Sequence, residues 1–154
     1  MNTELLEIEQ LMQSRKYAEA ESRLGQFLAD YPQHPLALAW FALCQHGQGR
    51  QQAAELVIQS AIDSSPHLPF GYHARAKIHS QAGRYDEALV AINEALQVAP
   101  NYIDAYSQKA SILVHMKRFK DALQTVEAGL SIQADDDACL VIRAVLLVET
   151  GRFQ

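Results

Sequence analysis

Alanine recurs at a fixed interval of 34 residues along this chain. Two other residue classes, proline and a large aromatic residue, keep the same interval in phases of their own. The three series are Ala20, Ala54, Ala88 and Ala122; Pro32, Pro66 and Pro100; and Tyr17, Tyr85, Phe119 and Phe153. A constant period of this length indicates one supersecondary unit copied in tandem, so it constrains the fold more than any local motif does.

Residues 69–102 show what one unit contains. Apolar and small residues recur at helical spacing up to Gly83, a residue able to adopt the left-handed backbone that ends many helices. Asp86 and Glu87 then suit the positive end of a second helix, and Pro100 cannot continue that helix. Each unit is therefore predicted to be a helix of about 13 residues, a tight turn and a second helix, with no strand.

A second alanine series falls in the first helix of each unit, at Ala42, Ala76, Ala110 and Ala144. Two antiparallel helices that pack closely need small side chains where their axes approach. Both alanine series are therefore expected at helix–helix contacts.

The combined pattern resembles the tetratricopeptide repeat (TPR) family over essentially the whole chain. The large position of that family's first helix is matched by Leu38, Tyr72, Tyr106 and Leu140, and its small position by the four alanines from Ala42 to Ala144. The resemblance implies an all-α fold, an alpha-alpha superhelix or right-handed solenoid of antiparallel helix pairs. It divides a TPR domain, residues 1–154, into repeats 1–34, 35–68, 69–102 and 103–136 and a partial fifth repeat, 137–154. We expect the chain to be a fragment of a longer protein.

Three departures from the family pattern are informative. Glu4, Glu7 and Ile8 stand where large, apolar and small residues are expected, so the first helix is predicted to be a polar cap. Gln45 and His79 occupy a slot that is usually large and apolar. The fifth copy carries the turn signature 151–153 and lacks a second helix.

The resemblance also implies where a partner would bind. In the family, the first helices line a concave groove that contacts peptides, and this position-by-position reading predicts a partner-binding groove here. Its predicted residues are Met12, Leu43, His46, Phe70, His73, Lys77, Gln81, Ser111 and His115. A peptide with an apolar anchor and an acidic neighbour would suit Phe70, His73 and Lys77. The competing interpretation is that these are ordinary solvated residues of a scaffold. The cationic clamp by which some family members hold a C-terminal carboxylate is not matched.

Residues 138–148 are more apolar than a solvent-facing terminal helix should be. We therefore expect an oligomer face that includes Leu140, Leu146 and Leu147, and a homodimer formed through this last helix. A self-assembling module is thus the alternative to a peptide-binding scaffold. A chaperone, or a regulatory arm of a larger protein, also remains open.

Other functional classes find little support. The net charge of −5 disfavours a nucleic-acid partner. The sequence has no catalytic motif, cofactor motif or metal-ligand spacing, so we expect no enzyme activity, no cofactor and no metal. Neither a signal peptide nor a membrane span is indicated, so a cytoplasmic location without direct membrane contact is expected. Cys44 and Cys139 are predicted to be reduced packing residues, and Asp135, Asp136 and Asp137 to cap the last helix.

One further series, Arg75, Lys109 and Arg143, keeps the period of 34. These long side chains are expected to lie along a neighbouring helix, with their charges beside repeat acids such as Glu94 or Glu127. A row that binds an acidic partner is the alternative.

Overall fold

The computed structural model describes residues 2–151, which form nine α-helices and no strand. The helices are α1 (Thr3–Gln13), α2 (Tyr17–Asp30), α3 (Pro35–Gly47), α4 (Gln51–Ser64), α5 (Phe70–Gln81), α6 (Tyr85–Val98), α7 (Ile103–His115), α8 (Phe119–Ile132) and α9 (Asp137–Gly151). Four helix pairs and the first helix of a fifth unit are therefore present, as the 34-residue period predicts.

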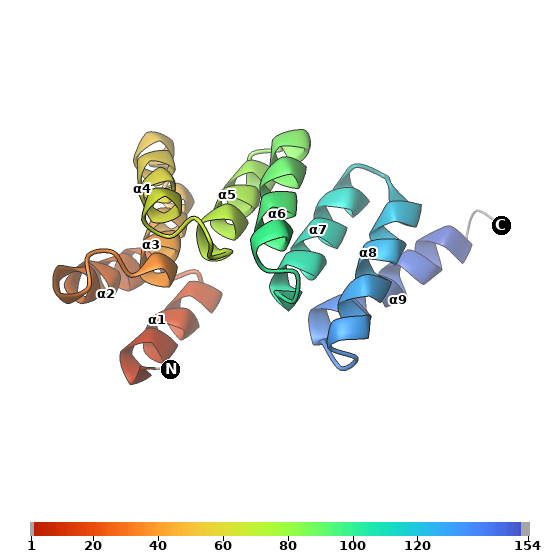
Figure 1. Ribbon diagram of the computed structural model, residues 1–154, viewed down its shortest axis with the longest axis horizontal. Helices are drawn as coiled ribbons and strands as arrows, with labels where there is room; N and C mark the ends of the chain where they lie inside the picture. The colour runs from red at the N-terminus through yellow and green to blue at the C-terminus, as the bar shows by residue number, and fades with distance from the viewer. Residues whose placement is uncertain (1, 152–154) are drawn as a thin grey trace.

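The helices follow one another in chain order from the N-terminal to the C-terminal end (Figure 1). Each helix packs against the next one in the chain. The odd-numbered helices also contact one another, α1 with α3, α3 with α5, α5 with α7 and α7 with α9, whereas within residues 2–151 the even-numbered helices do not. The odd-numbered helices thus form one layer, and the even-numbered helices form a second layer behind it.

The periodic alanines lie at the contacts between helices. The fully buried members of the two series are Ala20, Ala42, Ala54, Ala76, Ala88, Ala110 and Ala122. Ala144 on α9 is exposed, so its predicted helix contact is wrong for the described residues. The physical reason is that no described helix follows α9, whereas α4, α6 and α8 follow the helices that carry the equivalent alanines.

The turns between paired helices share one backbone geometry. Gly49 and Gly83 have φ angles of 81° and 77°, which is the left-handed region predicted for Gly83. Arg15 and Lys117 occupy the same turn position with φ angles of 56° and 61°. Gly151 differs, because it is the last residue of α9. The rest of the predicted 151–153 turn signature, like Phe153 of the aromatic series, lies outside the described residues.

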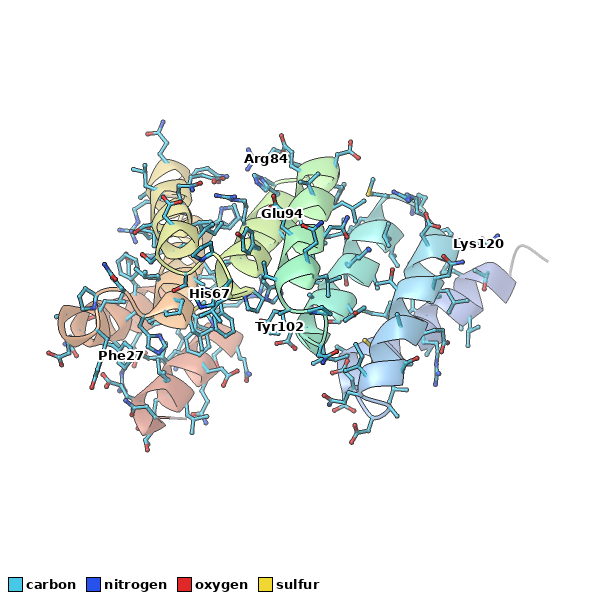
Figure 2. All side chains as sticks on the ribbon, in the orientation of Figure 1. Phe27, His67, Arg84, Glu94, Tyr102 and Lys120 are labelled. Carbon is cyan, nitrogen blue, oxygen red and sulfur yellow. The ribbon has the colours of Figure 1, made fainter. Side chains whose placement is uncertain are left out.

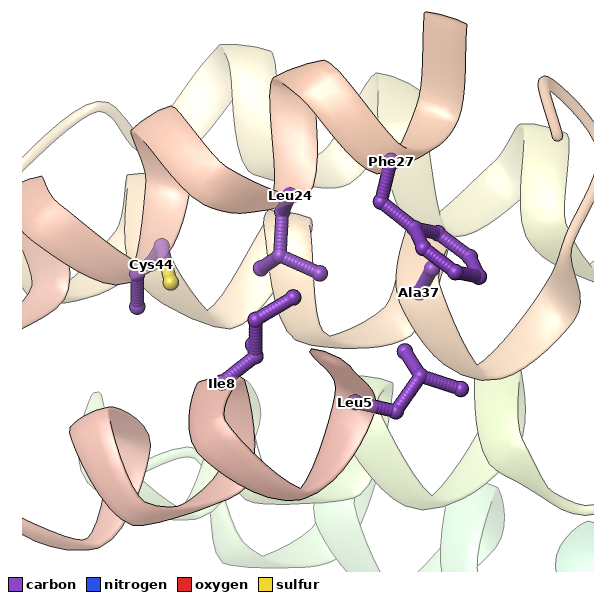
Figure 3. Packing of buried hydrophobic residues seen from close by; sticks show 7 residues of the cluster. Leu5, Ile8, Leu24, Phe27, Ala37 and Cys44 are labelled. Atoms are coloured by element: carbon purple, nitrogen blue, oxygen red, sulfur yellow. The ribbon is translucent and has the colours of Figure 1, made fainter. Parts of the chain in front are cut away.

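The core consists of a row of apolar clusters along the solenoid, and Figure 3 shows the first of them. Leu5 and Ile8 from α1 point toward Leu24 and Phe27 of α2. Ile8 is completely buried although a small residue was expected at its position. The predicted polar cap is therefore only partly correct, because α1 has an apolar face that closes this end of the core while Glu7 remains exposed.

Buried polar and sulfur-containing groups follow the sequence predictions closely. Cys44 and Cys139 are free thiols in the core, and burial raises the pKa of each to about 12. The carboxylate of Asp136 accepts the backbone N–H of Cys139 at 2.8 Å, which is the predicted cap of α9. Gln45 and His79 each place one buried side-chain atom, Oε1 and Nδ1 respectively, where no hydrogen-bond partner lies within the described chain.

Candidate interaction groove

The layer of odd-numbered helices holds an open hollow of about 250 Å³ between α1, α3 and α5. Its apolar lining includes Leu36, Trp40 and Phe70, and its polar lining includes His73 and Lys77. The full set of lining residues is Glu9, Leu36, Ala39, Trp40, Leu43, Phe70, His73, Ala74, Lys77, Tyr102 and Asp104. Successive turns of α3 and α5 supply most of these residues, because positions three and four apart share one face of a helix.

This hollow contains an aromatic cluster that joins α5 to the connection before α7. The ring of Tyr102 meets the rings of Phe70 and His73 edge to face, with centroids 6.0 and 5.4 Å apart. The hydroxyl of Tyr102 also lies 3.0 Å from Nδ1 of His73, within hydrogen-bond distance. Figure 2 labels Tyr102 at the connection between α6 and α7. This residue therefore ties the N-terminal end of α7 to the groove face of α5.

Burial and charge set the protonation of this cluster. Burial, with a smaller contribution from the Lys77 charge, lowers the pKa of His73 to about 4, so the imidazole is neutral at physiological pH. Burial also raises the pKa of Asp104, helped by the nearby Asp136, while Tyr102 and Lys77 oppose the rise. Burial, with the neighbouring Asp104 carboxylate, raises the pKa of the Tyr102 hydroxyl well above its usual value.

Lys77 is the cation of the hollow, and it is exposed. Across residues 2–151 no carboxylate oxygen lies within 4.0 Å of its ammonium group. Its charge is therefore not taken up by an ion pair, although the carboxylates of Glu9 and Asp104 line the same hollow.

Two further hollows adjoin the first one. A space of about 190 Å³ shares Trp40, Leu43 and Lys77 with it and extends to Met12 and Gln81. A more apolar space of about 500 Å³ shares Leu36 and Phe70 with the central hollow. That space is lined by Asn2, Leu5, Phe27, Tyr31, His34, Pro35, Leu36 and Phe70. The three spaces form a continuous groove over α3, between α1 and α5.

The structure brings together six of the nine residues predicted for the groove: Met12, Leu43, Phe70, His73, Lys77 and Gln81. His46 instead bonds to Gln51 at 3.1 Å, at the turn between α3 and α4. Ser111 and His115 lie on α7 outside the three spaces, and the His115 ring stacks on Tyr85 with centroids 5.3 Å apart. These three residues are therefore not part of the groove hollows.

The lining residues that sequence reasoning missed include two aromatic residues of the central hollow, Trp40 and Tyr102. Trp40 lies beside the predicted groove positions on α3 and reaches the hollow through its size. Tyr102 precedes α7 and so lies outside the helical pattern from which groove positions were assigned. The signal that could have found Tyr102 is its aromatic character at the boundary between repeats.

The predicted oligomer face on α9 needs a correction at Leu146. This side chain is fully buried in the last core cluster, so its place on an open face is wrong. Leu140 is half-buried against the same cluster, and Leu147 is 55% exposed. The large apolar side chains that α9 does expose are Val141, Val145, Leu147 and Val148.

Residues 2–151 contain neither a metal-binding cluster nor a membrane-spanning helix. No group of three or more His, Cys, Asp or Glu side chains there is placed to hold a metal ion. No helix in this part of the chain is long and apolar enough to cross a membrane.

Two models of the same protein family match this chain. One tetratricopeptide repeat profile matches residues 5–69, and a second matches residues 80–153. Together they cover nearly the whole chain. A comparison with curated protein sequences finds no match.

Solved structures resemble the fold closely at low sequence identity. A thermophilic TPR protein from Thermus thermophilus has a TM-score of 0.80 and 21% identity, over 97% of this chain and 82% of its own. Pseudomonas aeruginosa pilF has a TM-score of 0.75 and 18% identity, over 97% and 68% of the two chains. The first TPR domain of Spaghetti (RPAP3), bound to an HSP90 peptide, has a TM-score of 0.69 and 18% identity, over 77% and 97%.

Proposed function

The chain belongs to the tetratricopeptide repeat family, and from that premise we propose that it is a protein-interaction scaffold whose groove binds a peptide segment of a partner protein. One observation carries the proposal: Lys77 has no carboxylate partner within residues 2–151, and it lies in the same hollow as the apolar side chains of Leu36 and Phe70. Such a surface offers both an apolar contact and a charge to one ligand.

The lining defines the chemistry of the peptide. An aliphatic or aromatic anchor fits between Leu36 and Phe70, where the central and the more apolar hollow meet. An acidic side chain next to the anchor would pair with the Lys77 ammonium. From Phe70 to Gln81 the groove follows α5 for about 17 Å at 1.5 Å per residue, enough for roughly five extended residues or three helical turns.

The mode of binding differs from a cationic clamp on a C-terminal carboxylate. The solved structure of the first TPR domain of Spaghetti (RPAP3) contains a bound HSP90 peptide, SRMEEVD. In this chain α3 presents the apolar side chains of Ala39 and Leu43 to the central hollow. Lys77 is the single cation in the central hollow, so we propose recognition of an internal segment by its apolar anchor.

A peptide array tests the proposal. Fluorescent peptides of six residues, with each apolar residue beside Asp, Glu or a neutral residue, are screened for binding to the intact chain. Phe70→Ala and Lys77→Glu are expected to abolish binding of peptides that pair an apolar with an acidic residue. Lys120→Glu is the matched control, because Lys120 is an exposed lysine on α8 away from the groove (Figure 2).

The results separate the groove from other surfaces. Lys77→Glu should transfer preference from acidic to basic neighbours, because it replaces the single cationic side chain of the hollow with an anionic one. Unchanged binding in both groove variants, or equal loss in Lys120→Glu, would place the peptide elsewhere and overturn the proposal.

Self-assembly through α9 is the second candidate function, and one observation favours it. Val141, Val145, Leu147 and Val148 are each between 49% and 63% exposed on this helix. Removing such a surface from water favours association of two copies. Sedimentation of the chain and of the double variant Leu147→Gln, Val148→Gln tests this candidate: a dimer that the variant loses supports it, and a monomeric parent at high concentration rules it out.

A further inference from the structure

A separate open hollow of about 390 Å³ lies between α6, α7 and α8. It shares no lining residue with the three groove spaces. Its apolar wall is formed by Leu89, Tyr106 and Leu113, and its polar residues include Lys109 and Arg118. The volume falls in the range of small-ligand sites.

The 34-residue register gives Lys109 two counterparts whose contacts are known. Arg75 donates to Oε1 of Gln59 at 2.6 Å, and Arg143 lies 3.7 Å from the Glu127 carboxylate. In both cases the oxygen comes from the second helix of the preceding repeat, 16 residues earlier. The expectation that these cations lie beside repeat acids is therefore confirmed for Arg143 with Glu127.

Lys109 breaks this pattern. The residue at its register position on α6 is Asn93, and both side chains line the hollow. Lys109 makes no hydrogen bond or ion pair with any residue in 2–151, and Glu94 makes no ion pair in that range either. Unlike Arg75 and Arg143, Lys109 thus makes no bond to the side chain at its register position, although Asn93 also carries an amide oxygen.

Several polar side chains around the hollow have no partner within the described chain. Within the described chain, the side-chain amides of Asn93 and Gln124 are without partners, like the ammonium of Lys109. The carboxylate of Asp121 is already engaged by Arg118, at 2.6 Å. The hydroxyl of Tyr106 donates to the carbonyl of Pro100 at 2.7 Å. The groups left over are therefore the ammonium of Lys109, which can only donate, and two amides that each carry N–H donors beside a carbonyl oxygen.

We propose that this hollow binds a carboxylate, with the Lys109 ammonium as its principal partner and the amides of Asn93 and Gln124 as further donors. The ligand class follows from the charges. Arg118 and Asp121 neutralise each other, which leaves one uncompensated positive charge at Lys109. A carboxylate supplies one negative charge, whereas a phosphate group supplies up to about two.

The protonation of Lys109 agrees with this assignment. Burial lowers its pKa, and the Arg118 charge lowers it further, while Asp121 acts in the opposite direction. A bound carboxylate would stabilise the charged ammonium and raise this pKa. The site is independent of the groove, so its success or failure leaves the proposed peptide binding unaffected.

NMR titration of the intact chain tests the site, observed through the ¹³Cε resonance of Lys109. The probes are acetyl-glutamate amide, which mimics an acidic side chain of a partner protein, acetate, which represents a free carboxylate, and acetyl-glutamine amide, the neutral control. We expect the glutamate probe to shift the Lys109 resonance in a saturable way and to raise its pKa, and the glutamine probe to leave both unchanged.

Two variants and a control residue make the test specific. Lys109→Met keeps the side-chain stem and removes the charge. The affinity for the glutamate probe, followed through the shifts of backbone amides around the hollow, should therefore fall roughly tenfold or more, as expected for a lost bond to a charged group. Asn93→Glu supplies an internal carboxylate at the position equivalent to Glu127 and should also block the probe. Lys120, close to Arg118 in the sequence but outside the hollow, reports non-specific ion binding.

Each outcome decides the question. A response to the glutamate probe that exceeds the response to acetate assigns the carboxylate to a protein side chain, and an equal response assigns it to a free carboxylate. The proposal is overturned if Lys109 does not respond to either carboxylate, if Lys120 responds equally, or if the shifts around the hollow persist in Lys109→Met.

Discussion

The Nδ1 atom of His73 on α5 lies 3.0 Å from the hydroxyl of Tyr102, which directly precedes α7. This contact joins α5 to the start of α7 in the lining of the groove rather than within the apolar core. It also holds the imidazole in a buried setting beside the charge of Lys77, and that setting opposes protonation. Groove geometry and the protonation of His73 are therefore linked.

Protonation of His73 should weaken the fold in mild acid. Its pKa falls from 6.5 to about 4 on folding, so between these values the unfolded chain binds more protons than the folded one. The free energy of unfolding should therefore drop as pH falls from 6.5, by about 2 kcal/mol at pH 5 from this group alone. Urea unfolding of the parent and of His73→Asn at pH 7, 6 and 5 measures the difference. Parallel pH profiles in the two proteins would show that His73 does not titrate in this way.

Two glycines give a matched test of helix packing. A Cβ atom at Gly71 would lie 2.6 Å from Cγ1 of Ile62, so Gly71→Ala should lower the free energy of unfolding by about 1–3 kcal/mol through overpacking. Gly25 lies within α2, where an added Cβ atom would meet nothing within 4 Å, so Gly25→Ala should raise stability by roughly 0.5–1 kcal/mol. Chemical denaturation of both variants checks the signs. A neutral Gly71→Ala would mean that α4 and α5 are not in close contact.

The sequence predicted the helices well because their boundaries are local events. Gly83 ends one helix through its left-handed backbone, and the period of 34 carries that boundary to the other repeats. The same register also predicts that the Leu146 side chain is buried. This residue is equivalent to Ile78 and Ile112, which are both fully buried. Its placement on an open face followed from the apolar composition of α9 instead of from its position in the repeat.

The groove was predictable only in part because its shape depends on how repeats meet. Residues on one helical face, such as Phe70, His73 and Lys77, were found from their spacing. Tyr102 enters from a connection between helices, and Trp40 reaches the hollow through the size of its ring. The spacing of residues within a single helix predicts neither of these contributions to the lining.

At the turn position shared by the repeats, removing a glycine should lower the free energy of unfolding, and introducing one should raise it. Gly83→Ala places a Cβ on a backbone with φ of 77° and should cost about 1–2 kcal/mol. Lys117→Gly relieves the same conformation at φ of 61° and should gain up to about 1 kcal/mol, reduced by the greater freedom of glycine in the unfolded chain. Urea midpoints of the two variants provide the measurement. If Gly83→Ala has no cost, the turn does not require its left-handed backbone.

Gln45 offers a stabilising substitution. Its Oε1 is buried without a hydrogen-bond partner in the described chain, at the repeat position where Leu113 is 2% exposed. Gln45→Leu removes the unsatisfied atom and should raise the free energy of unfolding by about 1 kcal/mol. The reverse change, Leu113→Gln, should be destabilising because it buries a new polar group. Thermal unfolding of both variants tests the pair, and a loss of stability in Gln45→Leu would indicate that the amide has a role that the apolar replacement cannot fill.

Leu146 and Leu147 are neighbours on α9 with opposite environments, one fully buried and the other 55% exposed. Leu146→Ala should lower the free energy of unfolding by about 2–5 kcal/mol, because it opens a cavity beside Val126 and Cys139. Leu147→Ala should change it by no more than about 0.5 kcal/mol in the isolated chain. Denaturation at low protein concentration separates the two effects, since association cannot then mask the loss of an exposed contact. A large effect of Leu147→Ala that grows with protein concentration would instead identify this face as the place where two copies meet.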